Sequence, residues 1–210
     1  MTVAWPPLSR DFYCRDTTQV ACQLLGKLLV RRARAGTTCG RIVEVEAYLH
    51  QDDPACHAAR GRTRSNRAMF GPPGRAYVYP IHSRWCLNAV TESPGVACAV
   101  LIRAVEPLVG IELMRRRRGS VKTVDLARGP ARLCEAFGID RRLDHWDLTK
   151  QRRLWISGPE IAPLGTDEIV ATPRIGISAA RELKLRFFVD GSPYVSGRRS
   201  DHRRKPLVNP

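Results

Sequence analysis

The sequence has no long apolar run and no leader-like segment. Nowhere among its 210 residues do about 18 apolar residues follow one another, so no part of it is expected to cross a membrane. The N-terminal stretch TVAWPPLSRDFYCRD also lacks the uninterrupted apolar segment of a signal peptide. We therefore expect a soluble, cytoplasmic protein without membrane contact.

Several catalytic and ligand-binding motifs are missing as well. The chain contains neither a Walker loop nor G-x-G-x-x-G, which argues against a nucleotide-hydrolysing machine, and it has no G-x-S-x-G to mark a serine nucleophile. His50, Asp52, Asp53 and His57 match none of the recurring zinc or calcium spacings. We expect no metal and no other cofactor.

Paired cysteines are also lacking. The seven cysteines are odd in number, scattered and without a C-x-x-C pair, which is typical of buried thiols in a reducing compartment. They are Cys14, Cys22, Cys39, Cys56, Cys86, Cys98 and Cys134.

Acidic residues are few beside basic ones. The chain has 20 Asp and Glu against 35 Lys and Arg, a formal net charge of +15. A basic surface attracts a phosphate backbone by releasing condensed counterions, so nucleic acid is the first partner to consider. On charge alone, an arginine-rich composition without any ligand is the alternative.

The length suits one domain with a sizeable core. Apolar residues at helical spacing behind possible N-caps at residues 16–18 predict a first helix that Gly26 ends. Two strand-like runs around a turn at residues 35–37 predict an antiparallel pair, with residues 41–48 as its second strand. Residues 49–75 show little periodicity and are expected to form a long loop, and a loop of this length is usually either functional or disordered.

The remaining segments continue this mixed pattern. AYVYPIHSRWCLNAV and VACAVLIRAVEP predict strands, with a hairpin tip at residues 82–84. GIELMRRRR and GPARLCEAFG predict helices, and RLWIS, RIGIS and LKLRFFV predict further strands. The polar and basic residues 198–210 are expected to form a flexible tail.

Two glutamates stand out in the strand at residues 41–48. Strand alternation places Ile42, Glu44, Glu46 and Tyr48 on one face, and Val43, Val45 and Ala47 on a face that suits a core. The first face is either an exposed surface whose glutamates pair with arginines or a site.

Acidic, aromatic, histidine and arginine side chains among turns suit the removal of a flipped base. Rings stack on the base, polar groups read its edge, and a carboxylate takes a proton from the attacking water. An alkylated purine already carries positive charge and departs without much help from a general acid, so a second catalytic carboxylate is not required.

The order of the motifs resembles the alkyladenine (3-methyladenine) DNA glycosylase family from about Leu24 to Ser196. The motifs are LLGKLLVRR, GRIVEVEAY, DDPACH, MFGPPGRAYVY, WCLN, AVLIRAVEPLVGIELM, GPARLCEAFGI, RIGIS and LRFFVDGSPYVS. The resemblance implies a mixed α/β (α+β) fold, with a curved, mostly antiparallel sheet, surrounding helices and a protruding β-hairpin that inserts into DNA. Residues 1–197 would form this single DNA glycosylase domain.

The resemblance also implies roles for individual residues. Glu46 would be the general base and Arg103 the arginine that holds the water. Because an unpaired charge in the apolar strand AVLIRAV would be costly, we expect a carboxylate such as Glu46 to be the partner of Arg103. The damaged base would be bound by Tyr48, His57, Tyr79 and Asn88. Tyr79 could alternatively be a core residue.

This sequence departs from the family at the hairpin. YVYPIHSRWCLN is one residue shorter than usual and lacks the tip tyrosine that takes the place of the flipped base and the following Gly-Met pair. Ile81 or His82 would fill that space incompletely, which favours lesions that are already poorly paired. Ile81, His82 and Arg84 at the hairpin, with Arg62 and Arg64 in GRTRSNRAMF, are the predicted DNA contacts.

The resulting hypothesis is a monofunctional base-excision-repair enzyme that acts as a monomer on double-stranded DNA with damaged purines and leaves an abasic site. No lysine is among the catalytic and base-binding residues that the resemblance implies, so no Schiff base is expected. Two alternatives remain: a non-catalytic, basic DNA-binding protein, and a metal-dependent nuclease that uses Glu44, Glu46, Asp52 and Asp53. The sequence leaves 3-methyladenine, hypoxanthine and ethenoadenine all open as substrates.

Overall fold

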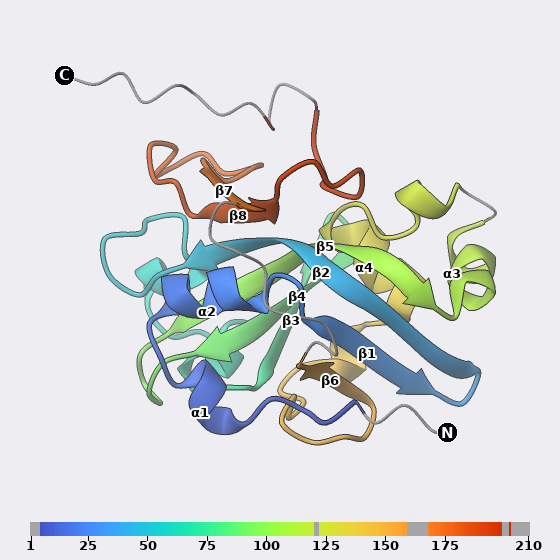
Figure 1. Ribbon diagram of the computed structural model, residues 1–210. Helices are drawn as coiled ribbons and strands as arrows, with labels where there is room; N and C mark the ends of the chain where they lie inside the picture. Colours follow the sequence, from blue (N-terminus) through green and yellow to red (C-terminus); the bar gives the residue numbers. More distant parts are fainter. Residues whose placement is uncertain (1–4, 120–121, 159–167, 199–201, 203–210) are drawn as a thin grey trace.

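Strand β2 (Gly36–Tyr48) organises the sheet in the computed structural model, which describes residues 5–119, 122–158, 168–198 and 202. It pairs with β5 (Cys98–Val109) along one edge. Along the other edge it pairs first with β1 (Leu28–Ala33) and then with β8 (Arg186–Val189). β2 is therefore covered on both edges, and its carboxyl half lies at the centre of the molecule (Figure 1).

The other strands extend this sheet in the order β3-β4-β5-β2-β1-β6, with β7 added to β8. Every strand pair is antiparallel. The added strands are β3 (Ala76–Ile81), β4 (Arg84–Thr91), β6 (Leu154–Ser157) and β7 (Ile169–Thr172). The fold is the expected mixed α/β type with a curved antiparallel sheet.

Short helices flank the sheet. They are α1 (Arg10–Tyr13), α2 (Thr17–Leu24), α3 (Ile111–Arg118) and α4 (Pro130–Phe137). As predicted, an N-cap begins α2, where the Asp16 side chain accepts a hydrogen bond from the Gln19 amide. Figure 1 shows α2 at one end of the sheet, and α3 at the other. One main core joins α2 and α4 to the strands through Leu24, Val45 and Phe137.

The pairing of β2 with β5 contains a bulge that alters the predicted faces. The register shifts between Ile42 and Glu44 and again between Glu44 and Val45, and it passes over Val43 on β2 and Arg103 on β5. Ile42 therefore lies in the main core with Val45, not on the face of Glu44 as simple alternation predicted. Alternation fails here because a bulge adds one residue to the strand.

The predicted strand RIGIS is also wrong. Residues 173–185 contain no strand, and β7 precedes them. The reason is tertiary contact, because the Arg174 side chain is engaged by Asp53 and the Ile175 amide donates to Glu46 instead of to a neighbouring strand. The predicted basic tail, residues 198–210, lies outside the described residues except for Arg198 and His202.

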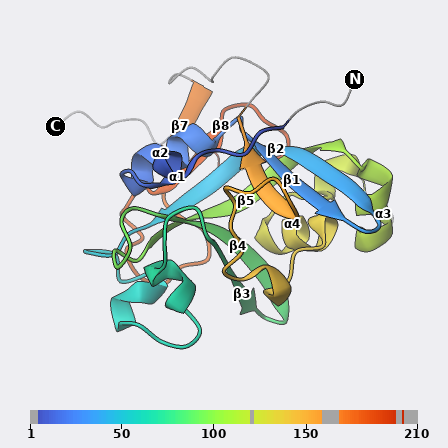
Figure 2. The ribbon, with the colours of Figure 1, turned by 90° about the horizontal axis from the view of Figure 1, so that it is seen from below.

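The hairpin and the loop before it lie side by side. His82 and Ser83 form a two-residue tip with φ of 43° and 64°, as a type I′ turn requires, and Arg84 begins β4 rather than belonging to the tip. The loop of residues 49–75 contains two 3-10 turns, His57–Arg60 and Arg67–Phe70, the second of which packs beside β3 (Figure 2). Within the described part of the chain, no helix is long and apolar enough to cross a membrane.

Candidate active site

Glu44 and Glu46 are both fully buried on β2. The interpretation of this face as an exposed surface is therefore wrong, although its pairing of glutamates with arginines is found. Glu44 accepts hydrogen bonds from Arg103 at 3.1 Å, Arg186 at 2.6 Å and the Ser196 amide at 2.7 Å. Burial alone would raise the pKa of Glu44, but Arg103 and Arg186 outweigh it and hold the pKa below its usual value.

Glu46 lies two residues further along β2, next to the hydroxyl of Tyr48. Its Oε1 accepts from the Ile175 amide at 2.8 Å and lies 3.2 Å from Nη1 of Arg103. Its Oε2 accepts from the Tyr48 hydroxyl at 2.9 Å. Burial, followed by the charge of Glu46, raises the pKa of Tyr48, so this phenol stays protonated and able to donate.

Arg103 joins the two carboxylates, as its position in an apolar strand predicted. Its Nε faces Glu44, its Nη2 donates to Oγ of Ser196 at 3.3 Å, and its Nη1 faces Glu46. Burial alone would lower the pKa of Arg103, but the two glutamates raise it above its usual value. The bulge leaves Arg103 without an opposite residue on β2 and places its side chain between the carboxylates.

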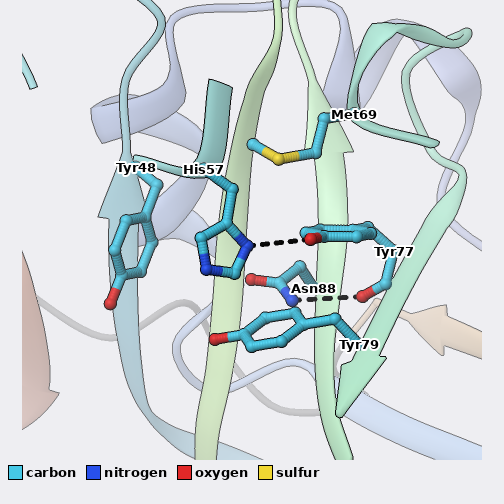
Figure 3. Close-up of a pocket in the computed structure, with 6 residues that line it drawn as sticks. All are labelled: Tyr48, His57, Met69, Tyr77, Tyr79 and Asn88. Atoms are coloured by element: carbon cyan, nitrogen blue, oxygen red, sulfur yellow. Dashed lines mark hydrogen bonds between the residues drawn. The ribbon is translucent and has the colours of Figure 1, made fainter. Parts of the chain in front are cut away.

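A pocket lined mainly by rings lies beside Glu46. Its lining residues are Tyr48, His57, Met69, Tyr77, Tyr79 and Asn88. Figure 3 shows Tyr48 across the pocket from Tyr79, with His57 between them and Met69 above. All four residues predicted to bind the base line this pocket, and Tyr79 also packs against a smaller core cluster that includes Tyr77.

His57 is positioned by Tyr77, which the sequence analysis did not single out. Nδ1 of His57 lies 2.8 Å from the Tyr77 hydroxyl, and its ring contacts the Tyr79 ring with centroids 4.6 Å apart. Burial and then Arg60 lower the pKa of His57 from its usual 6.5, so the imidazole is neutral at neutral pH. Sequence spacing could have identified Tyr77, because it lies two residues before Tyr79 and residues two apart on a strand share a face.

Asn88 offers one free edge to the pocket. Its Nδ2 donates to the Tyr77 carbonyl at 3.1 Å, which fixes the amide orientation. Figure 3 shows its Oδ1 directed toward the space below His57. A base in the pocket would therefore meet a hydrogen-bond acceptor at this position.

Arg174 and Asp53 form a second buried ion pair that the sequence analysis missed. The two side chains meet in bidentate fashion, with both distances 2.6 Å. The guanidinium lies over the Tyr48 ring, 4.6 Å from its centroid, and donates to the Ala47 carbonyl. The pair thus supports Tyr48 and fixes the start of the loop that carries His57.

The predicted DNA contacts lie at the surface, apart from the ring pocket. Ile81 is 45% exposed, Arg84 pairs with Glu135 on α4, and Arg62 lies over the Phe70 ring. His82 and Arg64 are exposed.

The structure does not assemble the nuclease alternative. Glu44 and Asp53 are each engaged by arginines, while Asp52 is exposed. In the described ranges, no group of three or more His, Cys, Asp or Glu side chains could hold a metal ion.

Residues 11–193 match the family model of methylpurine-DNA glycosylases. A protein of Methanoculleus marisnigri is 50% identical over 195 residues, 91% of this chain and 99% of that protein. One of Carboxydothermus hydrogenoformans is 47% identical over 190 residues, 90% of this chain and 98% of that protein. Both are named "Putative 3-methyladenine DNA glycosylase".

Proposed function

The chain belongs to the methylpurine-DNA glycosylase family and is a DNA glycosylase, and on that premise we propose that it flips alkylated or deaminated purines out of duplex DNA and hydrolyses them off with Glu46 as general base. One observation carries this proposal. A buried carboxylate with an adjacent arginine lies beside a pocket lined by three tyrosines and a neutral histidine. A protein that only bound DNA would not need that carboxylate.

The proposed reaction is a hydrolysis of the N-glycosidic bond. Water attacks C1′ while the bond from C1′ to the base nitrogen breaks, and the electron pair of that bond leaves with the base. Glu46 takes the proton that the water loses, so the sugar gains a hydroxyl and the DNA an abasic site. An alkylated purine leaves as a neutral base, because it was positively charged before, whereas a deaminated purine leaves as an anion and takes a proton from solvent.

Arg103 would hold both the carboxylate and the water. Its Nη1 is already 3.2 Å from Glu46, so a water that accepts from this guanidinium lies within reach of the Glu46 carboxylate. Because the arginine also contacts Glu44 and Ser196, its position does not depend on the water. None of the pocket residues carries an amine, which agrees with hydrolysis instead of Schiff-base chemistry.

The pocket residues would recognise the flipped base. Tyr48 lies across the pocket from Tyr79, with His57 between them, and aromatic faces attract a cationic, alkylated ring. Asn88 would contribute selectivity through its free oxygen. We propose that 3-methyladenine is a substrate, and that hypoxanthine and ethenoadenine are the next two to test.

We assign the DNA-inserting role to Ile81 in preference to His82. Ile81 follows Tyr77 and Tyr79 at two-residue steps on β3, so it shares their face and extends the line of rings toward the tip. His82 instead occupies a turn position with positive φ. An isoleucine fills less space than a tyrosine, so we expect the enzyme to favour lesions that are already poorly paired.

The test uses duplexes that each carry one of the three lesions, followed by cleavage at abasic sites. Release of at least one base by the wild-type protein is expected, and release of none would refute the proposal. Glu46→Gln should abolish base release while leaving DNA binding intact. Retained release in that variant would exclude Glu46 as the base.

A further inference from the structure

Four buried charged side chains alternate in sign between β8 and the pocket. In order they are Arg186, Glu44, Arg103 and Glu46, which we name the charge chain. Each is at most 7% exposed, and the formal charges sum to zero. The last member, Glu46, accepts a hydrogen bond from the pocket residue Tyr48.

The far end of the charge chain is fixed by many contacts. Arg186 donates to Thr172 at 3.0 Å and to the Ser196 carbonyl at 3.1 Å, and its guanidinium lies over the Phe188 ring. Ser196 also donates its amide to Glu44 and accepts from Arg103. The two inner charges, Glu44 and Arg103, are therefore also held by Ser196, which follows β8 in the chain.

We propose that Glu44 and Arg186 are positioning residues that hold Arg103 toward Glu46 and set the electrostatic field at the general base. The inference rests on the proposed function of Glu46. Glu44 lies between two guanidiniums, so one negative charge keeps Arg186 and Arg103 close together despite their repulsion. Without Arg186, Glu44 would draw Arg103 more strongly away from Glu46.

Few other charges act on Glu46. The groups that face it from the surrounding elements are Glu44 and Tyr48 on β2, Tyr79 on β3, Cys86 on β4, Arg103 on β5, and Arg174 with the Ile175 amide after β7. Burial raises the pKa values of Tyr48, Tyr79 and Cys86, so these three are uncharged at neutral pH. The charge of Arg174 is matched by Asp53. The charge chain therefore dominates the field at Glu46.

Single substitutions of Arg186 and Glu44 should consequently shift the pH–rate profile in opposite directions. Arg186→Gln leaves an excess negative charge beside the proposed general base and should move the acid limb of the pH–rate profile to higher pH. Glu44→Gln leaves an excess positive charge and moves the limb to lower pH. We expect each shift to be on the order of one pH unit for charges several ångströms apart in a protein interior. The double variant restores neutrality and should return the limb close to that of the wild type.

The measurement is single-turnover release of 3-methyladenine from methylated duplex DNA across pH, corrected for release without enzyme. A parallel series in a His57→Gln background removes the second group whose titration could shape the acid limb. Arg41→Gln and Glu106→Gln are matched controls, because this pair spans the same two strands. Arg41 lies five residues before Glu46, which is roughly 16 Å along a strand.

Opposite shifts that cancel in the double variant are the expected result. If both single variants shift the limb in the same direction, or neither shifts it, the inference is wrong, and the residues merely stabilise the fold. Should Glu44→Gln fail to fold, Arg186→Lys replaces it: the retained charge should leave the limb unmoved while the melting temperature falls. An inactive wild type, or a fully active Glu46→Gln, would instead refute the proposed function itself.

Discussion

The carboxyl half of β2 and the tip of the hairpin β3–β4 are built in contrasting ways. Glu44 and Glu46 are fully buried and each makes several hydrogen bonds or ion pairs. At the tip, Ile81 is 45% exposed, and His82 and Ser83 hold the left-handed backbone of a tight turn. The proposed chemistry lies where many contacts fix the geometry, and the proposed DNA contact lies where few do.

This contrast explains why the carboxyl half of β2 keeps the family's motif while the hairpin tip departs from it. Removing the charge of Glu44 would take away the carboxylate that lies between Arg103 and Arg186, and losing one partner of a buried ion pair is strongly destabilising. Shortening the hairpin by one residue changes only exposed atoms, because the two-residue turn closes it without gaps in the strand pairing. Variation at the tip therefore affects DNA contact more than folding.

The largest effect should come from the buried pair of Asp53 and Arg174. Asp53→Asn leaves the guanidinium without its bidentate partner, and we expect the free energy of unfolding to fall by about 3–5 kcal/mol, measured by urea denaturation. The control is Asp140→Asn, whose exposed partner Arg142 should make the loss below about 1 kcal/mol. Equal losses in the two variants would contradict the contrast between buried and exposed regions.

A smaller effect should follow from removing the hydroxyl that orients His57. Tyr77→Phe keeps the ring in the pocket but removes the 2.8 Å contact to Nδ1. A hydrogen bond contributes about 1 kcal/mol net, so base release in single turnover should slow roughly five- to tenfold. Tyr13→Phe is the matched control, because this buried hydroxyl lies outside the pocket and has no hydrogen-bond partner among the described residues. A rate for Tyr77→Phe that equals the control would exclude the orienting role.

The hairpin tip should respond differently from β2. Ile81→Gly removes the side chain proposed to fill the space of the flipped base, and we expect excision from a fully paired duplex to slow by roughly threefold to tenfold. Excision from a mismatched or single-stranded substrate should change little, since less unstacking is needed there. The ratio of the two rates is the measurement. A ratio unchanged from that of the wild type would show that Ile81 does not fill the space of the flipped base.

Caps, turns and periodicity are local signals and predicted helices at α2, α3 and α4, whereas the fold class came from the resemblance of the motif order to a known family. The sequence also brought Tyr48, His57, Tyr79 and Asn88 to one site through their motif order. It did not predict the bulge at Val43, because a bulge depends on the partner strand and leaves no local signature.

Charge was the least reliable guide to the surface. The four arginines that end α3 suggest a DNA contact, yet Arg115 pairs with Glu112 and Arg118 with Glu135. Arg117 donates to the Ala136 carbonyl near the end of α4. Much of the basic run thus supports the packing of two helices, so net charge overstates the positive surface that is available to DNA.

The smallest predicted effect is a loss of stability at acid pH, which follows from the neutral state of His57. Burial lowers the pKa of His57 below its usual 6.5, so as the pH falls below about 6.5 the unfolded chain binds a proton before the folded chain does. Stability is then lost as the pH falls through this window and levels off below the folded-state pKa. Because the ring is partly exposed, we expect only a few tenths of a kcal/mol.

Urea denaturation of the wild type and of His57→Gln at about pH 7.5 and about pH 5.5 measures this difference. Carboxylates with lowered pKa values, such as Glu44 and Asp147, are retained in both proteins, and their stabilising effect is lost only at more acid pH, so they cancel in the comparison. The wild type should lose slightly more stability than the variant. A smaller loss in the wild type would mean that a protonated imidazole is the favoured state, and that the pocket is built for a cationic His57 instead of a neutral one.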